Sequence, residues 1–306
     1  MDASLAAVAL QSGGLSLSLP PGVGYAVVAA FVWGTYIFAL KRYFDYPGTV
    51  LTVCVNVAAI LWYLPLTLST PPSAVPDAGT IGVADAGILL LTVVTTAAAF
   101  LVFLAALDAG EVSYVAPINK VVPVFVLPIE VLFLQERLEP IQIAGVVVAT
   151  LAVYVANYRR GYLLDPLRKA VTARPAQLAL LSAACYAVSD VGKRLVLQEM
   201  SVPTTLWVPT LLGGVVVVLL PLVVRDWVPV RGDLPKFALA GAGVALGEHV
   251  TSLAFAAAPA SIASPVINTQ AVVAVLLGGV VLRERAFGTR LVAAALAVTG
   301  VGLIAL

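Results

Sequence analysis

Long and almost uninterrupted apolar runs dominate the chain, and short groups of proline, glycine or charged residues separate them. A helix needs about 20 mostly apolar residues to cross a hydrocarbon core of roughly 30 Å. Membrane β-strands would instead alternate polar and apolar positions over about ten residues, which these Ala-, Leu- and Val-rich runs do not do. The pattern predicts ten transmembrane helices, at residues 22–40, 48–68, 86–107, 112–134, 140–158, 175–197, 203–224, 235–258, 261–282 and 288–306.

The composition agrees with a membrane protein and excludes several other classes. Of the 306 residues, 61% are apolar and 11% are charged, whereas soluble domains carry about 25% charged residues. A soluble globule of this size could not bury so much apolar surface. Two isolated cysteines, Cys54 and Cys185, exclude a secreted disulfide scaffold. A net charge of +1 argues against nucleic acid as a partner.

Little of the chain lies outside the predicted spans. The longest gaps, 69–85 and 159–174, are each under 20 residues, which leaves no room for a soluble catalytic or binding domain. Residues 1–21 lack a basic region and resemble a disordered tail more than a signal peptide. We therefore expect two five-helix units, at 22–158 and 175–306, joined by a basic loop at 159–174.

An internal repeat links the two units. Residues 106–157 align with 254–305 at a constant offset of 148, although only ten of the 52 positions are identical. The stronger signal is Ser-x3-Pro followed 19 residues later by Glu-Arg, which occurs at Ser113, Pro117, Glu136 and Arg137 and again at Ser261, Pro265, Glu284 and Arg285. The alternative is a chance match in a low-complexity composition.

The repeat predicts an inverted topology. Each unit has five spans, and because five is odd the second unit enters the membrane from the opposite side. Many transporters use such inverted repeats, related by a pseudo-two-fold axis in the membrane plane, to alternate access around a central site. The expected fold class is an all-α integral membrane protein with ten helices in two inverted five-helix repeats, which favours a carrier over a membrane enzyme or a receptor.

Several short motifs resemble one transporter family. The second unit is similar to an EamA-type repeat of the drug/metabolite transporter superfamily at Ala263-Ser264-Pro265, Leu276-Leu277-Gly278-Gly279, Arg283-Glu284-Arg285, Gly300 and Gly302. The first unit resembles it at Trp33-Gly34, Ala116-Pro117, Glu136-Arg137, Gln142 and Gly145. Both units lack the glycine that usually precedes Glu-Arg in this family. The resemblance implies a ten-helix multi-pass transporter, and it implies nothing about the substrate.

The distribution of positive charge predicts the orientation. Thirteen of the 17 Lys and Arg residues lie at odd-numbered connections between spans, and three lie at even-numbered ones. Cytoplasmic loops are enriched in Lys and Arg, so the charge count predicts both termini outside and the 159–174 loop in the cytoplasm. The family resemblance implies the opposite, both termini inside. We follow the charge count because it is lopsided.

Four ionisable residues lie well inside predicted spans, where a charge is costly and marks a pathway or a site. Glu248 shares a helix face with Thr251, Ser252 and Phe255, so it is a candidate proton acceptor or an anchor for a substrate amine. The alternatives are an ion pair with Lys120 or a protonated carboxyl that holds helices together. His249, the single histidine, cannot build a metal site; it is either a proton relay or an interhelical hydrogen-bonding group.

Lys120 and Asp190 are the other two. Lys120 follows Pro117 by one helical turn and could bind a carboxylate or phosphate; its counterpart in the repeat is Asn268. Pro117 and Pro265 are candidate helix kinks, each of which frees a backbone carbonyl; the alternative is a simple packing kink. Asp190 either joins the site or forms an ion pair with Lys193 and Arg194 at the end of a span.

Aromatic and amide side chains complete the set of candidates. The predicted substrate-binding residues are Trp33, Tyr36, Asn56, Asn119, Lys120, Tyr186, Asp190, Glu248, His249 and Asn268. The aromatic members could stack on a flat substrate, and the alternative is ordinary packing. The amides could line a cavity or join helices. We expect the cavity to lie among the first, third, fourth, sixth, eighth and ninth spans.

The sequence contains no constellation typical of an enzyme. A Walker A sequence, a Gly-x-Ser-x-Gly elbow and a His-Glu-x-x-His motif are all missing. We expect a monomeric or homodimeric secondary transporter in the cell membrane, without cofactor or metal, that exports an amino acid or related zwitterion. Proton coupling through Glu248 is a further hypothesis. The alternatives are a nucleotide-sugar or sugar-phosphate carrier and, in another class, a lipid-linked scramblase or a non-transporting scaffold.

Overall fold

The computed structural model describes residues 21–76, 81–133, 139–157, 172–258, 260–281 and 287–304. Every regular element in these ranges is a helix, and no strand occurs within them. Three predicted features lie outside them, wholly or almost so: the tail at 1–21, most of the loop at 159–174, and the two Glu-Arg turns at 136–137 and 284–285.

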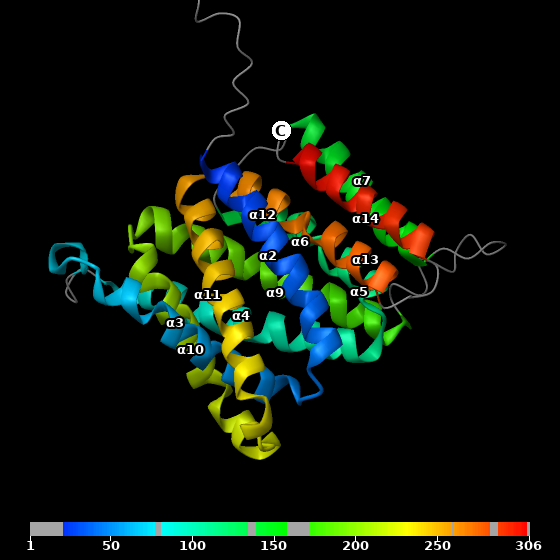
Figure 1. The fold of residues 1–306 in the computed structure, drawn as a ribbon. Coiled ribbons are helices and arrows are strands. Elements are labelled where there is room, and N and C mark those ends of the chain that lie inside the picture. The colour runs from blue at the N-terminus through cyan, green and yellow to red at the C-terminus, as the bar shows by residue number, and fades with distance from the viewer. Residues whose placement is uncertain are drawn as a thin grey trace, which may run out of the picture.

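The helices follow one another along the chain in two sets (Figure 1). The first set is α2 (Pro21–Tyr43), α3 (Gly48–Leu68), α4 (Val83–Ala109), α5 (Val112–Asn119), α6 (Val122–Phe133) and α7 (Pro140–Asn157). The second set is α9 (Arg174–Arg194), the π-helical turn η2 (Leu195–Glu199), α10 (Thr204–Asp226), α11 (Leu234–Ala257), α12 (Ala260–Asn268), α13 (Gln270–Val281) and α14 (Phe287–Ile304). Short 3-10 turns occur at Pro72–Ala74 and Arg231–Asp233.

Within the described ranges, six helical stretches are long and apolar enough to cross a bilayer: Pro21–Tyr43, Gly48–Leu68, Val83–Ala109, Thr204–Asp226, Arg231–Ala257 and Ile262–Val281. Large apolar side chains such as Phe31, Trp62 and Leu90 are exposed on their outer faces, where hydrocarbon rather than water is the favourable neighbour. The prediction of an all-helical membrane protein is confirmed. The count of ten crossings stays a prediction.

Two of the predicted spans are interrupted rather than continuous. The span expected at 112–134 divides into α5 and α6 at Lys120–Val121, because Pro123 has no N–H to donate to the carbonyl of Asn119. The span expected at 261–282 divides into α12 and α13 at Thr269, whose hydroxyl donates to the carbonyl of Val266 at 2.8 Å. The two interruptions follow Pro117 and Pro265, respectively, by about one helical turn.

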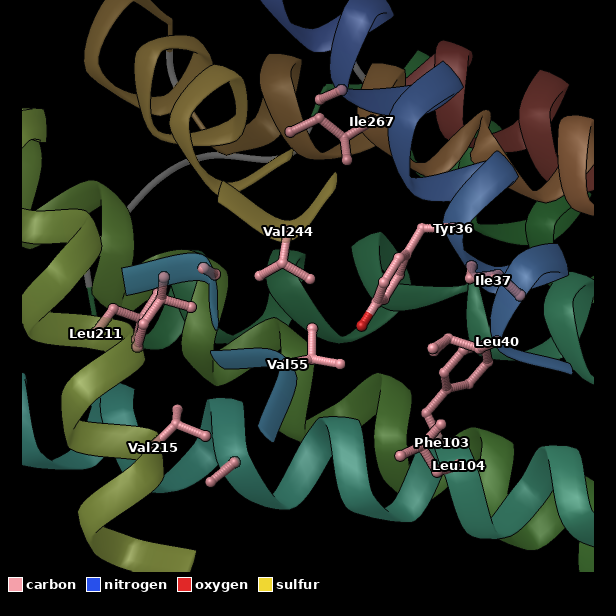
Figure 2. Packing of buried hydrophobic residues seen from close by; sticks show 14 of the residues in the cluster. Tyr36, Ile37, Leu40, Val55, Phe103, Leu104, Leu211, Val215, Val244 and Ile267 are labelled. Atoms are coloured by element: carbon pink, nitrogen blue, oxygen red, sulfur yellow. The ribbon is translucent and has the colours of Figure 1, made fainter. Parts of the chain in front are cut away.

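Small residues allow the helices to approach closely. Fully buried alanines line the helix contacts, among them Ala26, Ala29, Ala59, Ala97, Ala99, Ala106, Ala176, Ala179 and Ala183. Small residues are enriched at helix contacts in membranes, where dispersion between closely packed backbones replaces the hydrophobic effect. Larger apolar side chains, including Val55, Leu104, Leu211 and Val215, fill the space between the helices (Figure 2).

Contacts at helix ends fix the directions of the first three helices. The ammonium of Lys41, near the end of α2, donates to the carbonyl of Leu107, near the end of α4. Gly48, at the start of α3, packs against Leu104 of α4. The end of α2, the start of α3 and the end of α4 therefore lie together, so α2 and α4 run in one direction and α3 runs in the other.

Each of these helices packs antiparallel to a helix of the second set. For α3 and α10, Thr49 donates to Asp226 at 3.0 Å, and Thr70 donates to Thr205 at 2.7 Å. For α4 and α9, contacts pair Thr92 with Gly192, Thr96 with Ser189 and Ala99 with Ser182. For α2 and α11, Gly22 abuts Ala258, whereas Tyr36 approaches Gly243. The directions of α9, α10 and α11 are therefore opposite to those of α2, α3 and α4, respectively.

Helices of each set also pack mainly on helices of the other set. The first helix of one set, α2, packs on α11, α12 and α13 of the other, while α9 packs on α4, α5 and α6. The two second helices, α3 and α10, pack on each other, and so do the two last helices, α7 and α14. Figure 1 shows α7 and α14 side by side at the edge of the bundle. The other helices surround its centre.

A glycine at the contact between α3 and α11 provides a test of this packing. A Cβ on Gly241 would lie 2.5 Å from the Cβ of Ala58 and 2.8 Å from the backbone of Ala58 and Ala59. We expect Gly241→Ala to lower the free energy of unfolding by about 1–3 kcal/mol, because the two helices must separate. Thermal unfolding of detergent-purified protein measures the loss. The control is Gly213→Ala in α10, where no atom lies within 4 Å of the new Cβ; an equal melting temperature for both variants would contradict the close approach.

Candidate functional site

A cavity lies between the two sets of helices, with about 950 Å³ of unfilled space including its open mouth. The expected segments line it: α2, α4, α9, α11 and the two interrupted helices. In addition, α3 contributes Thr52 and Asn56, and α10 contributes apolar residues such as Leu211. Eight of the ten predicted substrate-binding residues meet here, namely Trp33, Tyr36, Asn56, Lys120, Tyr186, Asp190, Glu248 and Asn268.

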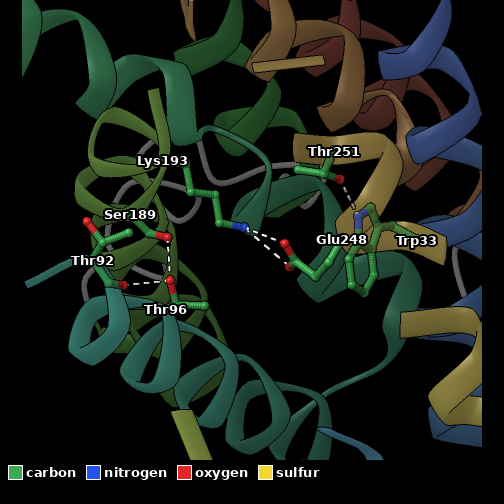
Figure 3. A network of polar contacts seen from close by, with 7 residues as sticks. All are labelled: Trp33, Thr92, Thr96, Ser189, Lys193, Glu248 and Thr251. Atoms are coloured by element: carbon green, nitrogen blue, oxygen red, sulfur yellow. Dashed lines mark hydrogen bonds and ion pairs between the residues drawn. The ribbon is translucent and has the colours of Figure 1, made fainter. Parts of the chain in front are cut away.

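A buried ion pair joins α9 to α11 at the wall of the cavity. The ammonium of Lys193 donates to both oxygens of the Glu248 carboxylate, at 3.2 Å to Oε1 and 3.0 Å to Oε2. The two side chains are only 6% and 10% exposed, and Figure 3 shows them reaching toward each other from opposite helices. Glu248 is therefore paired with Lys193, and not with Lys120, which was the partner considered from the sequence.

Asp190 lies one turn before Lys193 on α9 and also lines the cavity. Its carboxylate accepts a hydrogen bond from the hydroxyl of Ser264 in α12 at 2.8 Å, and Ser264 in turn accepts one from the amide of Asn268 at 3.2 Å. No cationic nitrogen of the described residues lies within 4 Å of this carboxylate. The structure therefore places Asp190 in the cavity wall rather than in a close ion pair with Lys193 or Arg194 at the end of a span.

Lys120 is buried, with 6% of its surface exposed, at the interruption between α5 and α6. Its ammonium lies 5.5 Å from the ring centroid of Phe103 and 5.0 Å from that of Tyr186. Aromatic faces attract a cation through their quadrupole, at about 2 kcal/mol in a desolvated setting. No carboxylate oxygen of the described residues lies within 4 Å of this ammonium, and Asp190 attracts it only from a longer distance, so Lys120 presents a cation to the cavity that an anionic group could meet.

Aromatic residues of α2 and α4 also line the cavity. The indole of Trp33 donates to the hydroxyl of Thr251 at 2.9 Å, and its ring meets Tyr36 edge-on with centroids 5.6 Å apart. Tyr36 stacks on Phe100 at 6.4 Å. The buried Tyr36 hydroxyl has no hydrogen-bond partner among the described residues, and Figure 2 shows it pointing away from α2 toward the centre of the bundle.

Two predicted site residues lie away from the cavity lining. The amide of Asn119 donates to the hydroxyl of Ser182 at 2.8 Å and to the carbonyl of Ala179 at 3.3 Å, which ties α5 to α9. The Nδ1 atom of His249 is 2.7 Å from the Tyr63 hydroxyl, which joins α11 to α3. These contacts match the interhelical alternative considered for amides and for His249.

Sequence reasoning missed Lys193 as a residue of the cavity. The charge count along the sequence assigns Lys193 to a connection between spans, because it lies close to the end of the span predicted at 175–197. In the structure Lys193 lies in the last turn of α9 and faces inward, with only 4% of its surface exposed. The available signal was its spacing: Lys193 follows Asp190 by three residues, on the same helix face.

The geometry defines a class: an all-helical, multi-pass membrane protein whose two oppositely directed halves enclose a polar cavity. The chain belongs to the EamA-like transporter family, whose model matches it twice, at residues 20–158 and 174–306. Members of this family are transporters rather than enzymes, and their partners are a small-molecule substrate and the lipid bilayer. The predicted resemblance to EamA-type transporters is confirmed.

Solved structures support the fold. One of them, described only as "Crystal structure of protein", superposes with a TM-score of 0.62 at 15% sequence identity, covering 91% of this chain and 95% of that one. At this identity the likeness concerns the fold alone. No curated protein matches the chain.

The buried ion pair makes a stability prediction. We expect Lys193→Met and Glu248→Leu each to lower the free energy of unfolding by about 3–5 kcal/mol, because each leaves an uncompensated charge in a desolvated site. The double variant should recover most of the loss, since no lone charge remains. Thermal unfolding in detergent measures all three. The control is Arg225→Gln in the exposed pair with Asp226, where the Arg225 side chain is 74% exposed; it should change the stability little. Additive losses in the double variant would contradict the coupling between Lys193 and Glu248.

Proposed function

We propose that the protein is a secondary transporter that exports a small zwitterionic metabolite, an amino acid or a close relative, across the cell membrane by alternating access. In this proposal ten crossings form two inverted five-helix repeats around one central cavity. The observation that carries the substrate class is the set of charges on the cavity wall. Two lysines and two carboxylates line it, so their formal charges cancel.

Only half of these charges form a close ion pair among the residues that the structure describes. Lys193 and Glu248 form a close ion pair, whereas Lys120 and Asp190 attract each other only at longer range, and neither has an oppositely charged atom of the described residues within 4 Å. A zwitterion offers a carboxylate to Lys120 and an ammonium to Asp190, and it leaves the cavity neutral. A substrate with a net charge would leave one charge unmatched in a low-dielectric site, which is costly. This balance favours a zwitterion over a sugar phosphate.

The rest of the lining suits a substrate with both polar and apolar parts. Ile37, Leu212 and Val244 supply apolar surface, while Asn56 and Gln270 supply amide groups. Such a mixture is usual in small-molecule sites, where apolar walls bury most of the ligand and a few polar groups fix its orientation.

The arrangement of the halves supports alternating access. Helices α2, α3 and α4 line the cavity from one half, and their counterparts α9, α10 and α11, which run in the opposite direction, line it from the other. Two such halves can exchange conformations by rocking against each other around a fixed site. A non-transporting scaffold protein would not require four charged residues on a cavity wall, because each buried charge is costly inside a membrane.

Ligand charge provides the sharpest test. Purified protein is heated with three matched compounds: an amino acid, its amide (a cation) and its N-acetyl derivative (an anion). We expect the amino acid to raise the melting temperature most, because a ligand that binds the native state stabilises it by mass action. The series is run for several side chains and alongside sugar phosphates. Stabilisation by sugar phosphates, with none by any zwitterion, would contradict the proposal in favour of the phosphate carrier.

Removing either of these two charges should weaken the binding of a zwitterionic substrate. We expect Lys120→Gln and Asp190→Asn each to lower amino-acid affinity about tenfold or more, since a hydrogen bond to a charged group contributes about 1.5–3 kcal/mol. Counterflow of radiolabelled amino acid in vesicles measures the loss. The control is Lys236→Gln, which removes a cation that pairs with Asp233 outside the cavity and is 52% exposed. Flux that is unchanged in both cavity variants would overturn the assignment.

A further inference from the structure

The Lys193 side chain occupies space in the cavity that a ligand could use. Its ammonium sits in a bidentate contact with Glu248, at 3.0 and 3.2 Å, and both residues line the cavity. Lys193 thus places a primary ammonium on the Glu248 carboxylate, as a bound amine would, and the lysine side chain attaches that ammonium to α9 (Figure 3).

No other cation is in position to serve Glu248. Among the described charged residues of the cavity, only Lys120 is another cation, and its ammonium lies between the rings of Phe103 and Tyr186 without contact to a carboxylate. If the Lys193 ammonium were absent, Glu248 would be a desolvated carboxylate with an open face toward the cavity. Such a group binds a cation strongly or takes up a proton.

We propose that Lys193 is a built-in counter-ion, whose ammonium fills an ammonium-binding site at Glu248 and thereby sets the charge of the substrate that the cavity accepts. With Lys193 in place, the cavity offers a substrate one unpaired cation and one unpaired carboxylate. Without it, the cavity carries two carboxylates against one lysine and a net charge of −1. The consequence for the substrate rests on the proposed function, but the ammonium site itself does not.

Two neighbouring features support this role for Lys193. The π-helical turn Leu195–Glu199 follows directly after α9, and such turns are rare and concentrate at functional sites. Within this turn the amide of Gln198 donates to the carbonyls of Phe255 and Ala258, at 2.6 and 2.9 Å. The end of α9 is thereby tied to the end of α11, which holds Lys193 opposite Glu248.

Chemical rescue tests the ammonium site. Lys193→Ala removes the tethered ammonium and leaves room for a small amine. We expect 100 mM ethylammonium to raise the melting temperature of this variant by about 3–5 °C relative to equal potassium chloride, and to leave the unsubstituted protein unchanged. Ethanol at the same concentration, which matches the size without the charge, should have no such effect. Lys193→Ala/Glu248→Gln should lose the response to ethylammonium.

The outcomes separate the possibilities. A response absent from Lys193→Ala, or equal in the double variant, overturns the ammonium site. Should Lys193→Ala not fold, Lys193→Met keeps the volume without the charge and is tested in the ligand series. It should shift preference at least tenfold from the amino acid toward its cationic amide, and an unchanged preference overturns the role in specificity. If the unsubstituted protein binds no zwitterion while ethylammonium still rescues Lys193→Ala, the proposed function fails and the ammonium site stands.

Discussion

A charge buried away from water must meet an opposite charge or a strongly polar group, and this requirement organises the centre of the molecule. Four charged side chains converge on one cavity. Lys193 and Glu248 neutralise each other, Asp190 receives a hydroxyl from Ser264, and Lys120 rests against two aromatic faces. The last two arrangements leave each charge without an oppositely charged atom of the described residues within 4 Å.

The two halves contribute unlike surfaces despite their repeated architecture. The first half supplies Lys120 and most of the aromatic rings, such as Trp33 and Phe100, while the second half supplies the other three charges on α9 and α11. Because the helices of the two halves run in opposite directions and exchange partners, one half faces the other across the cavity. The uneven distribution of aromatic and charged residues around the cavity therefore reflects divergence in sequence between the two halves.

Much of the candidate site could be found without coordinates, for one physical reason. Polar residues inside a span are costly, so Lys120, Asp190 and Glu248 stand out against the apolar background. Their partners could not be found in the same way. His249 and Asn119 are just as conspicuous in sequence, yet they hydrogen-bond to neighbouring helices, because the direction a side chain faces depends on how its helix packs.

The sequence by itself determined the class of protein, its helical segments, the repeat and the family resemblance, because hydropathy, helix length and short motifs are local properties. The tertiary structure decided which charges pair. The sequence places Lys193 near the end of a span, and only the packing of α9 against α11 brings its ammonium to Glu248, 55 residues away. Pairing between distant segments depends on the relative placement of helices, which no local pattern encodes.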